Sequence, residues 1–573
     1  MSDHTAEPVA DEVPQSEDEQ SDAAADPTLV GEKKKKKKNK KNKGKKAVAS
    51  DEIPSAPPEP ATGHKISPGM MQQILKANPS LAAETQGADP KVVQEMLGSL
   101  TVEEMLTGMA SGGKNKKDMA SYKFWATQPV TRFGMSLLGN FPGLVTAANH
   151  GRIEDEPESE RPDGPVREQK LEDVPKQGAD LVDGFEWDTM DLDDEKQINE
   201  VYDLLTNHYV EDNDAMFRFN YSAAFINWAL KSPGWLKSWH VGVRVSASKK
   251  LVAFISGIPV TLKVRNNDLK CSEINFLCIH KKLRAKRLAP VLIKEITRRC
   301  NLEEVWNAIY TAGVVLPKPI STCRYYHRSL DWLKLYDVGF SPLPVKSTKA
   351  RQVSRYALPV NTGTPGLRHM EGKDVDAVQV LLRKYLDRFD LAPRLNKADI
   401  EHWLLNKDNN PEDRVVWSYV VEVSTLDYFN LPVINNFVSI TKVDGKITDF
   451  FSFYKLESTA LKKNTLVRAA YLFYYASETA FIESPDVKRA LKTRLNALMN
   501  DALILAKGLG FHVFNALSLL DNSLFLVDQK FGAGDGSLHY YLFNWRTPFI
   551  KGGIDERNDV DEKNGSGIGM VML

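Results

Sequence analysis

The chain has 573 residues, of which 42% are hydrophobic and 26% are charged, and its formal net charge at pH 7 is +0. It has no apolar run of about eighteen residues and no charged-then-apolar signal at its N-terminus, which argues against a membrane-spanning helix and a secretory leader. The four cysteines fit no common zinc spacing, and a chain of this length needs no disulfides. We therefore expect reduced thiols and no metal site in a soluble, cytoplasmic protein.

Residues 1–115 are predicted to form a disordered extension that contains short helical fragments. Residues 1–65 are rich in Asp, Glu, Ser, Ala, Pro and Lys, and they carry too little apolar surface to offset the entropy of ordering. An acidic segment up to Glu32 is followed by a lysine run from Lys33 to Lys46. Such a block of like charge often binds nucleic acid or an anionic membrane, and a solubilising tail is the alternative.

The spacing of apolar residues predicts the elements that follow. A helix is expected from Asp188, with an apolar face made of Ile198, Val201, Tyr202, Leu204 and Leu205. Strands are expected at Leu251–Val264 and Ser272–His280, joined by a polar turn at residues 266–268. A helix follows from Leu288, and Val305–Val315 has mixed strand character.

After Pro359 the same kinds of element recur. A helix is predicted at Val375–Phe389, strands at Val415–Val423 and Ile447–Phe453, and a further helix at Leu498–Ala506. No close internal sequence repeat is visible. The pattern predicts an α+β fold with two halves of comparable size, residues 116–360 and residues 361–573.

The most informative stretch is the run from Glu273 to Pro290. It reads as a buried strand that ends in a basic loop, and the loop opens directly into a helix. Free N–H groups at a helix start, flanked by Lys and Arg, are suited to binding a pyrophosphate. A solvated basic loop before an ordinary amphipathic helix is the alternative.

A second motif runs from Lys530 to Leu542. Its three glycines surround Asp535, which suits a loop whose backbone approaches a ligand closely or adopts positive φ. A structural turn before a strand at His539–Trp545 is the alternative. The residues of the two motifs and their order along the chain allow a further interpretation.

In that order the two motifs resemble the signatures of the glycylpeptide N-tetradecanoyltransferases (N-myristoyltransferases), fungal-type members of the acyl-CoA N-acyltransferase class. The resemblance covers roughly Ser121 to Leu573, and further matches are Tyr122–Trp125, His208–Phe219, Tyr310–Pro319 and Asn515–Leu517. It implies two acyl-CoA N-acyltransferase-like halves related by pseudo-twofold symmetry, the first binding acyl-CoA and the second binding peptide. It also implies direct transfer of myristate from myristoyl-CoA to the α-amine of an N-terminal glycine.

The resemblance makes myristoyl-CoA a co-substrate and implies no permanently bound cofactor. The family more often has Ser at the position of Ala285, whose hydroxyl is lost here while the backbone N–H groups remain. Burying about twelve methylenes contributes roughly 10 kcal/mol gross to acyl-CoA binding. The positions assigned to the CoA are Tyr122, Lys123, Phe124, Trp125, Phe276, Leu277, Cys278, Ile279, Arg284, Ala285, Lys286, Arg287, Leu288, Ala289 and Thr297.

Catalysis in this family rests on backbone groups and on a chain terminus. The oxyanion hole falls on the N–H groups of Phe276 and Leu277, and such donors contribute about 3 kcal/mol each. The general base falls on the α-carboxylate of Leu573, at the end of an apolar, glycine-containing tail that suits a buried terminus. Proton transfer from an α-amine to an α-carboxylate in water is uphill by about 6 kcal/mol, and burial narrows this gap. We therefore predict a dry site around Leu573.

Peptide recognition is implied for a larger set of residues. Asp535 and the acidic turn at residues 211–214 could attract lysines that follow the substrate's first residues, and Tyr326 stands where many relatives have Trp. The positions carried over are Tyr209, Val210, Asp212, Phe217, Asn275, Thr311, Gly313, Tyr325, His327, Ser452, Tyr471, Asn515, Asp535, Gly536 and Leu538. The implied partners are proteins or nascent chains with an N-terminal glycine, possible ribosomal RNA contact through Lys33–Lys46, and no second subunit.

Several alternatives remain open at this stage. His280 and His327 are visible candidates for the general base, since a base near neutrality is usually histidine. Cys278 offers an acyl-enzyme route, although no histidine–acid pair is evident to activate it. Other readings of the whole chain are an acyl-CoA-dependent lysine or amine acetyltransferase and a ribosome-binding or RNA-binding adaptor.

Overall fold

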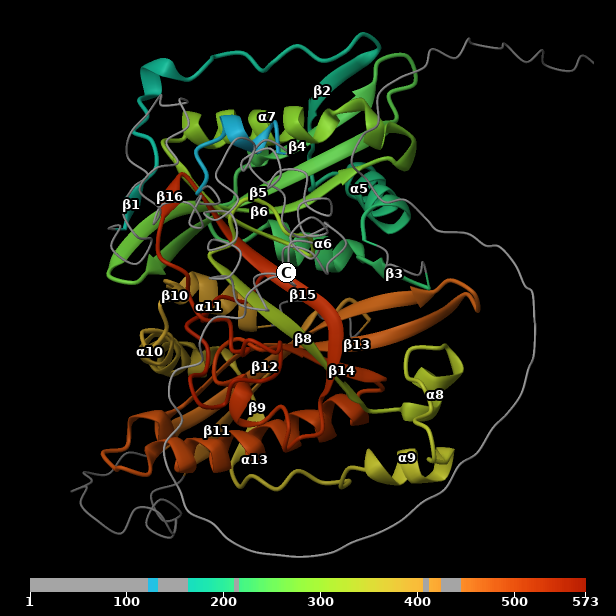
Figure 1. The fold of residues 1–573 in the computed structure, drawn as a ribbon, viewed down its shortest axis with the longest axis vertical. Coiled ribbons are helices and arrows are strands. Elements are labelled where there is room, and N and C mark those ends of the chain that lie inside the picture. The colour runs from blue at the N-terminus through green and yellow to red at the C-terminus, as the bar shows by residue number, and fades with distance from the viewer. Residues whose placement is uncertain (1–121, 132–162, 211–215, 406–411, 424–444) are drawn as a thin grey trace, which may run out of the picture.

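The computed structural model describes residues 122–131, 163–210, 216–405, 412–423 and 445–573. A 14-stranded sheet runs through the whole molecule in the order β2-β4-β5-β6-β7-β15-β8-β14-β13-β12-β11-β9, with β10 paired to β5 and β3 to β12 (Figure 1). The strands are β1 (Gly164–Pro165), β2 (Phe185–Thr189), β3 (Phe217–Asn220), β4 (His240–Val245), β5 (Leu251–Val264), β6 (Asn267–Ile279), β7 (Asn307–Ala312), β8 (Ser321–Ser329), β9 (Leu367–His369), β10 (Leu391–Pro393), β11 (Val416–Val423), β12 (Lys446–Ala460), β13 (Thr465–Ser477), β14 (Val513–Leu517), β15 (Gly532–Phe543) and β16 (Trp545–Arg546).

Helices cover both faces of this sheet. Phe254 of β5 belongs to the same apolar cluster as α5, whereas its neighbours Ala253 and Ile255 belong to the cluster of α7, because successive strand residues point to opposite faces. α5 and α7 therefore pack on opposite sides of β5 and β6. The α-helices are α5 (Glu195–His208), α6 (Ala223–Leu230), α7 (Leu288–Leu302), α8 (Trp332–Asp337), α9 (Lys349–Arg355), α10 (Val375–Leu386), α11 (Lys397–Leu404) and α13 (Val487–Gly508).

The two halves of the chain repeat one arrangement. In the first, β4, β5 and β6 pair antiparallel in series, α7 follows, and β7 then pairs parallel to β6. In the second, β11, β12 and β13 pair antiparallel in series, α13 follows, and β14 pairs parallel to β13. The mixed fold with two related halves is thus confirmed. Figure 1 shows β4, β5, β6 and α7 above and β11, β12, β13 and α13 below, with β8 and β15 between them.

The predicted division at residue 360 falls between α9 and β9, in a segment without helix or strand, and it stays a prediction. The division does not interrupt the sheet. β15, from the second half, lies between β7 and β8 of the first half, so the two halves share one sheet. The predicted disordered extension, the lysine run and Asp212 lie outside the described residues.

Several predicted elements match closely and others need correction. β5 has the predicted bounds, and α7 begins at Leu288 as predicted. The helix expected from Asp188 was placed too early: Asp188 lies in β2, where its carboxylate accepts a hydrogen bond from Arg244, and the helix begins after its N-cap Asp194. The predicted strand Ile447–Phe453 and helix Leu498–Ala506 are parts of the longer β12 and α13.

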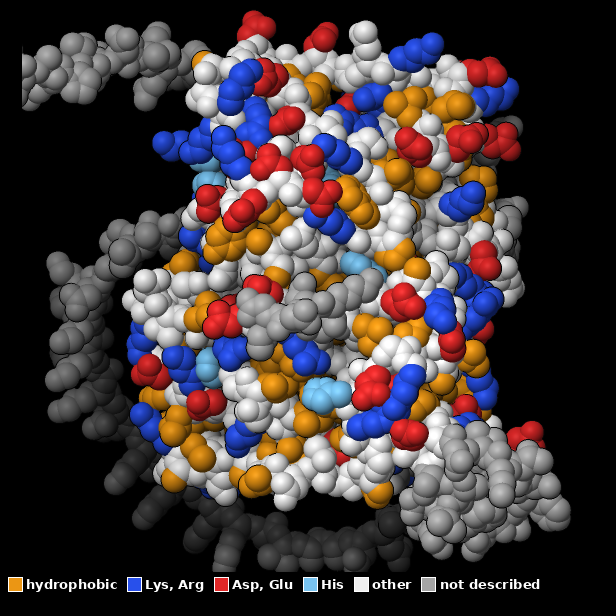
Figure 2. Space-filling model, turned by 180° about the vertical axis from the view of Figure 1, so that it is seen from behind, with side chains coloured by type: hydrophobic (Ala, Val, Ile, Leu, Met, Phe, Trp, Pro, Cys, Tyr) orange, Lys and Arg blue, Asp and Glu red, His pale blue; other side chains and the backbone are white. Residues whose placement is uncertain are grey.

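The surface carries interspersed charge. Figure 2 shows Lys and Arg side chains mixed with Asp and Glu side chains over the rear face, in keeping with the formal net charge of +0. All four cysteines are free, in keeping with the expected reduced thiols, and all four are buried. Among the described residues, no helix combines the length and apolarity that a membrane span requires.

Candidate active site

The basic loop after β6 folds as a six-residue 3-10 helix, η5 (Lys281–Lys286). The side chain of His280 accepts a hydrogen bond from the N–H of Lys282 and so caps the start of η5. Arg287 then adopts the left-handed conformation, with φ 56° and ψ 30°, and makes no side-chain capping bond to α7. The first turn of α7 therefore presents backbone N–H groups beside exposed Lys and Arg side chains, an arrangement suited to phosphate binding.

The basic loop is attached to the end of α5. The guanidinium of Arg284 donates a hydrogen bond to the carbonyl of His208, and the rings of His208 and His280 lie 4.0 Å apart. Burial, with the neighbouring His280 and Lys281, lowers the pKa of His208 to about 4. The role of His280 in the structure is thus to cap the loop, which gives it a structural task separate from that of a general base.

The segment Tyr122–Trp125 packs on the middle of the sheet. The ring of Trp125 stacks on Tyr310 of β7 at 5.7 Å, and Tyr310 in turn stacks on Tyr541 of β15 at 5.0 Å. The Tyr122 hydroxyl donates to the carbonyl of Val315 at 3.1 Å. These contacts hold the segment, whose Lys123 side chain is exposed.

The predicted oxyanion hole coincides with a β-bulge. Cys278 pairs with Phe254 and Asn275 with Ser256, so Phe276 and Leu277 together lie opposite the single residue Ile255. Phe276 has φ 57°, a rare conformation for a side chain of this size. The bulge interrupts the regular ladder at Phe276 and Leu277, and the N–H of Phe276 faces the hydroxyl of Tyr209.

An aromatic cluster surrounds this bulge. The ring of Phe276 lies 5.8 Å from Tyr209 and 5.4 Å from Tyr221. Burial raises the pKa of Tyr209 to about 12, and the adjacent N–H of Phe276 acts in the opposite direction. Tyr325 and Tyr471 lie close enough to Tyr221 to raise its pKa further. Three residues predicted for the peptide, Tyr209, Tyr325 and Tyr471, therefore come together, and Tyr221 joins them.

His327 and Asn515 form a polar pair next to this cluster. The two side chains lie on the neighbouring strands β8 and β14, with His327 Nδ1 2.7 Å from Asn515 Oδ1. Asn515 also stabilises the ionised form of Tyr471, against the larger effect of burial. Burial lowers the pKa of His327, and Asn515 and Asp535 oppose this shift.

The glycine motif is a bulge inside β15 and not a loop before a strand. Ala533 pairs with Tyr326 and Ser537 with Arg324, so Gly534, Asp535 and Gly536 project from the ladder opposite Tyr325. A Cβ atom on Gly534 would lie 2.4 Å from His327 Nε2 and 3.0 Å from the carbonyl oxygen of Tyr325. Position 534 therefore requires glycine, because any larger side chain would collide with two residues of the predicted peptide site. β15 begins at Gly532, before the strand start expected at His539, because the bulge residues are flanked by paired residues on both sides.

The chain's C-terminal tail is buried in the interior, as predicted. Ile568, Met570, Val571 and Met572 are between 0% and 6% exposed. Backbone hydrogen bonds fix the tail against β10 and the loop after β14: Gly569 donates to the carbonyl of Leu391, and Leu520 donates to that of Ile568. Figure 1 shows this terminus at the centre of the molecule.

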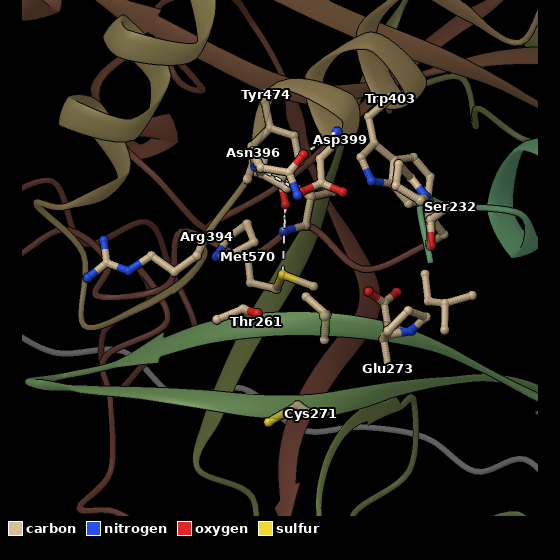
Figure 3. A pocket seen from close by; sticks show the side chains of 18 of the residues that line it. Ser232, Thr261, Cys271, Glu273, Arg394, Asn396, Asp399, Trp403, Tyr474 and Met570 are labelled. Carbon is tan, nitrogen blue, oxygen red and sulfur yellow. Dashed lines mark hydrogen bonds between the residues drawn. The ribbon is translucent and has the colours of Figure 1, made fainter. Parts of the chain in front are cut away.

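Leu573 lines a pocket of about 270 Å³ together with Glu273 (Figure 3). Glu273 is 5% exposed and points into the pocket from β6, with Asn396, Asp399 and Tyr474 on the opposite wall. Asn275 donates a hydrogen bond to its carboxylate at 2.8 Å. Burial raises the pKa of Glu273 to about 7, and the hydrogen bond from Asn275 opposes this shift.

Sequence reasoning gave Glu273 no role, although a carboxylate within an apolar strand was a usable signal. It also missed the tyrosines Tyr221, Tyr454 and Tyr474, which cannot be told from core aromatics in a sequence. The ring of Tyr454 stacks on that of Tyr471 at 5.3 Å.

Cys278 is buried beside the bulge, and its thiol donates to the carbonyl of Leu204 at 3.7 Å. Burial raises the pKa of this thiol to about 12, which disfavours the thiolate needed for an acyl-enzyme.

The remaining predicted residues are distributed around these features. Val210, Gly313, Asp535 and Gly536 are exposed, and Thr311, Leu538, Ala289 and Phe217 are half-buried. The hydroxyl of Thr297 donates within α7 to the carbonyl of Ile293, while Leu288 and Ile279 are buried in the apolar cluster of that helix. Lys286 is exposed beside Arg287, and Ser452 is fully buried.

The site combines a bulged strand with a basic loop that opens into a helix, and it lies in a fold with two repeated halves. These features are typical of an acyl-CoA-dependent acyltransferase. Residues 165–323 match the N-terminal domain, and residues 337–571 the C-terminal domain, of myristoyl-CoA:protein N-myristoyltransferase. The chain belongs to this family.

Curated relatives and solved structures agree with the assignment. The chain is 52% identical over 527 residues to the glycylpeptide N-tetradecanoyltransferase of Ajellomyces capsulatus, covering 92% of this chain and 91% of that protein. It is 53% identical over 517 residues to that of Emericella nidulans, covering 90% and 96%. A crystal structure of Saccharomyces cerevisiae N-myristoyltransferase with bound myristoyl-CoA is similar with TM-score 0.69 and 46% identity, covering 79% of this chain and 99% of that one.

Proposed function

We propose that this chain transfers myristate from myristoyl-CoA to the α-amine of an N-terminal glycine, by direct attack on the thioester. The burial of the C-terminal tail beside β6, the strand that carries the bulge, supports the mechanistic part of this proposal, because Leu573 lines one pocket together with Glu273 of that strand. Family membership supports the choice of substrates.

Acyl-CoA binding is assigned to the basic loop and its surroundings. The N–H groups of the first turn of α7 and the side chains of Arg284, Lys286 and Arg287 would hold the phosphates. The backbone of Ala285 lies within η5, which precedes that turn. Residues 122–125 would pack against the CoA from the sheet side. Myristoyl-CoA is consumed as a co-substrate, and we assign no permanently bound group.

The chemical step uses backbone donors and a carboxylate. The N–H groups of Phe276 and Leu277 would stabilise the negative charge that develops on the thioester oxygen. The α-carboxylate of Leu573 accepts a proton from the glycine ammonium, so that the free amine attacks the carbonyl carbon. A C–N bond forms, the C–S bond breaks, and CoA leaves with a proton on its sulfur.

Peptide binding is assigned to the aromatic cluster and the His327–Asn515 pair. Tyr209, Tyr325 and Tyr471 form a wall around the bulge, which suits an extended chain that enters with its amine first. Asp535 is exposed at the bulge of β15 and favours a basic residue farther along the peptide.

Mass spectrometry of two peptides tests the reaction and its specificity together. One peptide begins with Gly and the other with Ala, and each is incubated with the chain and myristoyl-CoA. A single myristoyl adduct on the Gly peptide alone is expected. Adducts on lysine side chains, or transfer from acetyl-CoA alone, would favour the acetyltransferase reading instead.

Deleting Leu573 tests the proposed base. We expect this variant to retain myristoyl-CoA binding and to lose transfer by at least about 100-fold, the scale of general-base catalysis. Adding one glycine after Leu573 moves the carboxylate without removing any side chain and should have the same effect. Full activity in both variants would assign the proton to another group.

We further propose that the chain acts as a cytoplasmic monomer and that Lys33–Lys46 binds ribosomal RNA. The support is the charge of the run and the reduced state of the cysteines. Ribosome binding should fall steeply with salt and be lost when the run is deleted, while peptide myristoylation survives. Salt-independent binding would contradict the phosphate contact.

A further inference from the structure

The second half of the chain repeats the bulge of the first. Phe451 pairs with Tyr475 and Phe453 with Leu472, so Phe473 and Tyr474 together lie opposite the single residue Ser452. The two bulges occupy similar places in β6 and β13, near the C-terminal end of the strand that precedes α7 or α13. Ser452 therefore corresponds to Ile255, and Tyr474 corresponds to Leu277.

The two bulges differ in what lies opposite them. The Ser452 hydroxyl donates to the carbonyl of Tyr474 at 2.8 Å and accepts from the N–H of Tyr474 at 3.2 Å. Ser452 is 0% exposed, so its hydroxyl closes the second bulge from within. Ile255 offers no polar atom at the corresponding place. The second bulge is thus closed by a hydroxyl on the facing strand, whereas the first bulge has no such hydroxyl opposite it.

The side chain of Tyr474 leads from the closed bulge to the C-terminal tail. Its hydroxyl accepts a hydrogen bond from the N–H of Val571 at 3.2 Å and lies 3.8 Å from the sulfur of Met570. Figure 3 shows Tyr474 and Met570 side by side, joined by a dashed line. A second tyrosine, Tyr540, donates to the carbonyl of Met570 at 2.9 Å. Tyrosine hydroxyls therefore hold the tail within three residues of its end.

We propose that Ser452 and Tyr474 are positioning residues for the terminal carboxylate: the bulge closed by Ser452 fixes Tyr474, and Tyr474 fixes Val571 and hence Leu573. The inference rests on the proposed role of Leu573 as the base. It also assigns Ser452 to the tail in place of the direct peptide contact implied by the resemblance, because its hydroxyl is fully buried and its only hydrogen is already donated to the carbonyl of Tyr474.

Two conservative variants of the full chain test the proposal, each with a matched control. Tyr474→Phe removes the hydroxyl that holds Val571. Tyr475→Phe removes that of the next residue, which donates to Asn522 and accepts from the N–H of Asp521 instead. Ser452→Ala removes the hydroxyl that closes the bulge. Ser418→Ala is its control, since Ser418 is the buried cross-strand neighbour of Ser452 and its hydroxyl has no hydrogen-bond partner.

The hydrogen-exchange rate of the Val571 amide measures directly how firmly the tail is held. The single-turnover rate of transfer on the preformed myristoyl-CoA complex measures the chemical step. We expect Tyr474→Phe and Ser452→Ala to increase exchange and to slow transfer by roughly fivefold or more, the effect of losing one buried hydrogen bond. Myristoyl-CoA affinity should stay unchanged, and both control variants should match the wild type.

Unchanged exchange in both test variants would overturn the proposal, as would faster exchange with a wild-type transfer rate. The variant that lacks Leu573 is measured in parallel to separate the two hypotheses. If that variant is inactive while Tyr474→Phe transfers normally, the positioning role is wrong and the base assignment stands. If the variant without Leu573 is itself active, the base assignment fails, and exchange alone decides whether Tyr474 holds the tail.

Discussion

Replacing Gly534 by alanine should displace His327 from the predicted peptide site. The new Cβ atom would lie 2.4 Å from His327 Nε2 and 2.9 Å from its Cδ2. The imidazole cannot rotate away freely, because its Nδ1 lies 2.7 Å from Asn515 Oδ1 and its ring packs edge-on against Phe340 at 5.4 Å. On the other side, the Tyr325 carbonyl oxygen, 3.0 Å from the new atom, is part of the sheet. The ring must therefore move.

The size of the effect follows from these contacts. Overpacking of this kind destabilises a folded protein by about 1–3 kcal/mol. Loss of the aligned His327–Asn515 pair should raise the KM for a Gly peptide by roughly two- to tenfold, the equivalent of one net hydrogen bond. Myristoyl-CoA affinity should not change, because β8 and the basic loop after β6 are separated by β7 and β15. Urea unfolding and steady-state kinetics measure the two effects.

The same motif supplies the control. A Cβ atom on Gly536 would lie 3.4 Å from Tyr325 Cδ2, and one on Gly532 would lie 3.8 Å from the nearest atom, the His327 carbonyl oxygen. Gly532→Ala should therefore behave as wild type. Adding His327→Ala to Gly534→Ala removes the clashing ring, so the double variant should be more stable than the sum of its single effects indicates. Additive effects, or equal losses in Gly532→Ala and Gly534→Ala, would refute the clash.

Two further predictions concern buried titratable groups. Glu273 has a folded pKa of about 7 against an ordinary value of 4.5. Its protonated form therefore stabilises the folded protein below pH 4.5, and this contribution, about 3 kcal/mol in all, is lost as pH rises from 4.5 through 7. Glu273→Gln should accordingly unfold at higher urea than wild type at pH 8 and at nearly the same urea at pH 4.5; an equal gap at both pH values would contradict the buried carboxyl. Cys278→Ala should keep its single-turnover rate within about threefold, because a thiol with a pKa of about 12 supplies almost no thiolate. A loss of about a thousandfold, with myristoyl-CoA still bound, would instead support an acyl-enzyme.

Local pattern accounted for much of the fold. The apolar run of β5 and the helical spacing after Leu288 predicted both elements at their observed starts, because strand and helix periodicity are properties of neighbouring residues. The helix predicted from Asp188 failed for the opposite reason. Asp188 reads as a helix start in the sequence, but in the structure it lies in β2 and forms an ion pair with Arg244 of the neighbouring strand β4.

For the site, the sequence by itself determined the basic loop, the apolar tail and the two motifs, since each is a contiguous run with its own chemistry. Only the tertiary structure decided that Gly534 faces His327, that Tyr474 holds Val571, and that Ser452 closes the second bulge while Ile255 lies opposite the first. Each of these contacts joins residues from different segments of the chain. Their contacts depend on the register of a sheet, which no local pattern specifies.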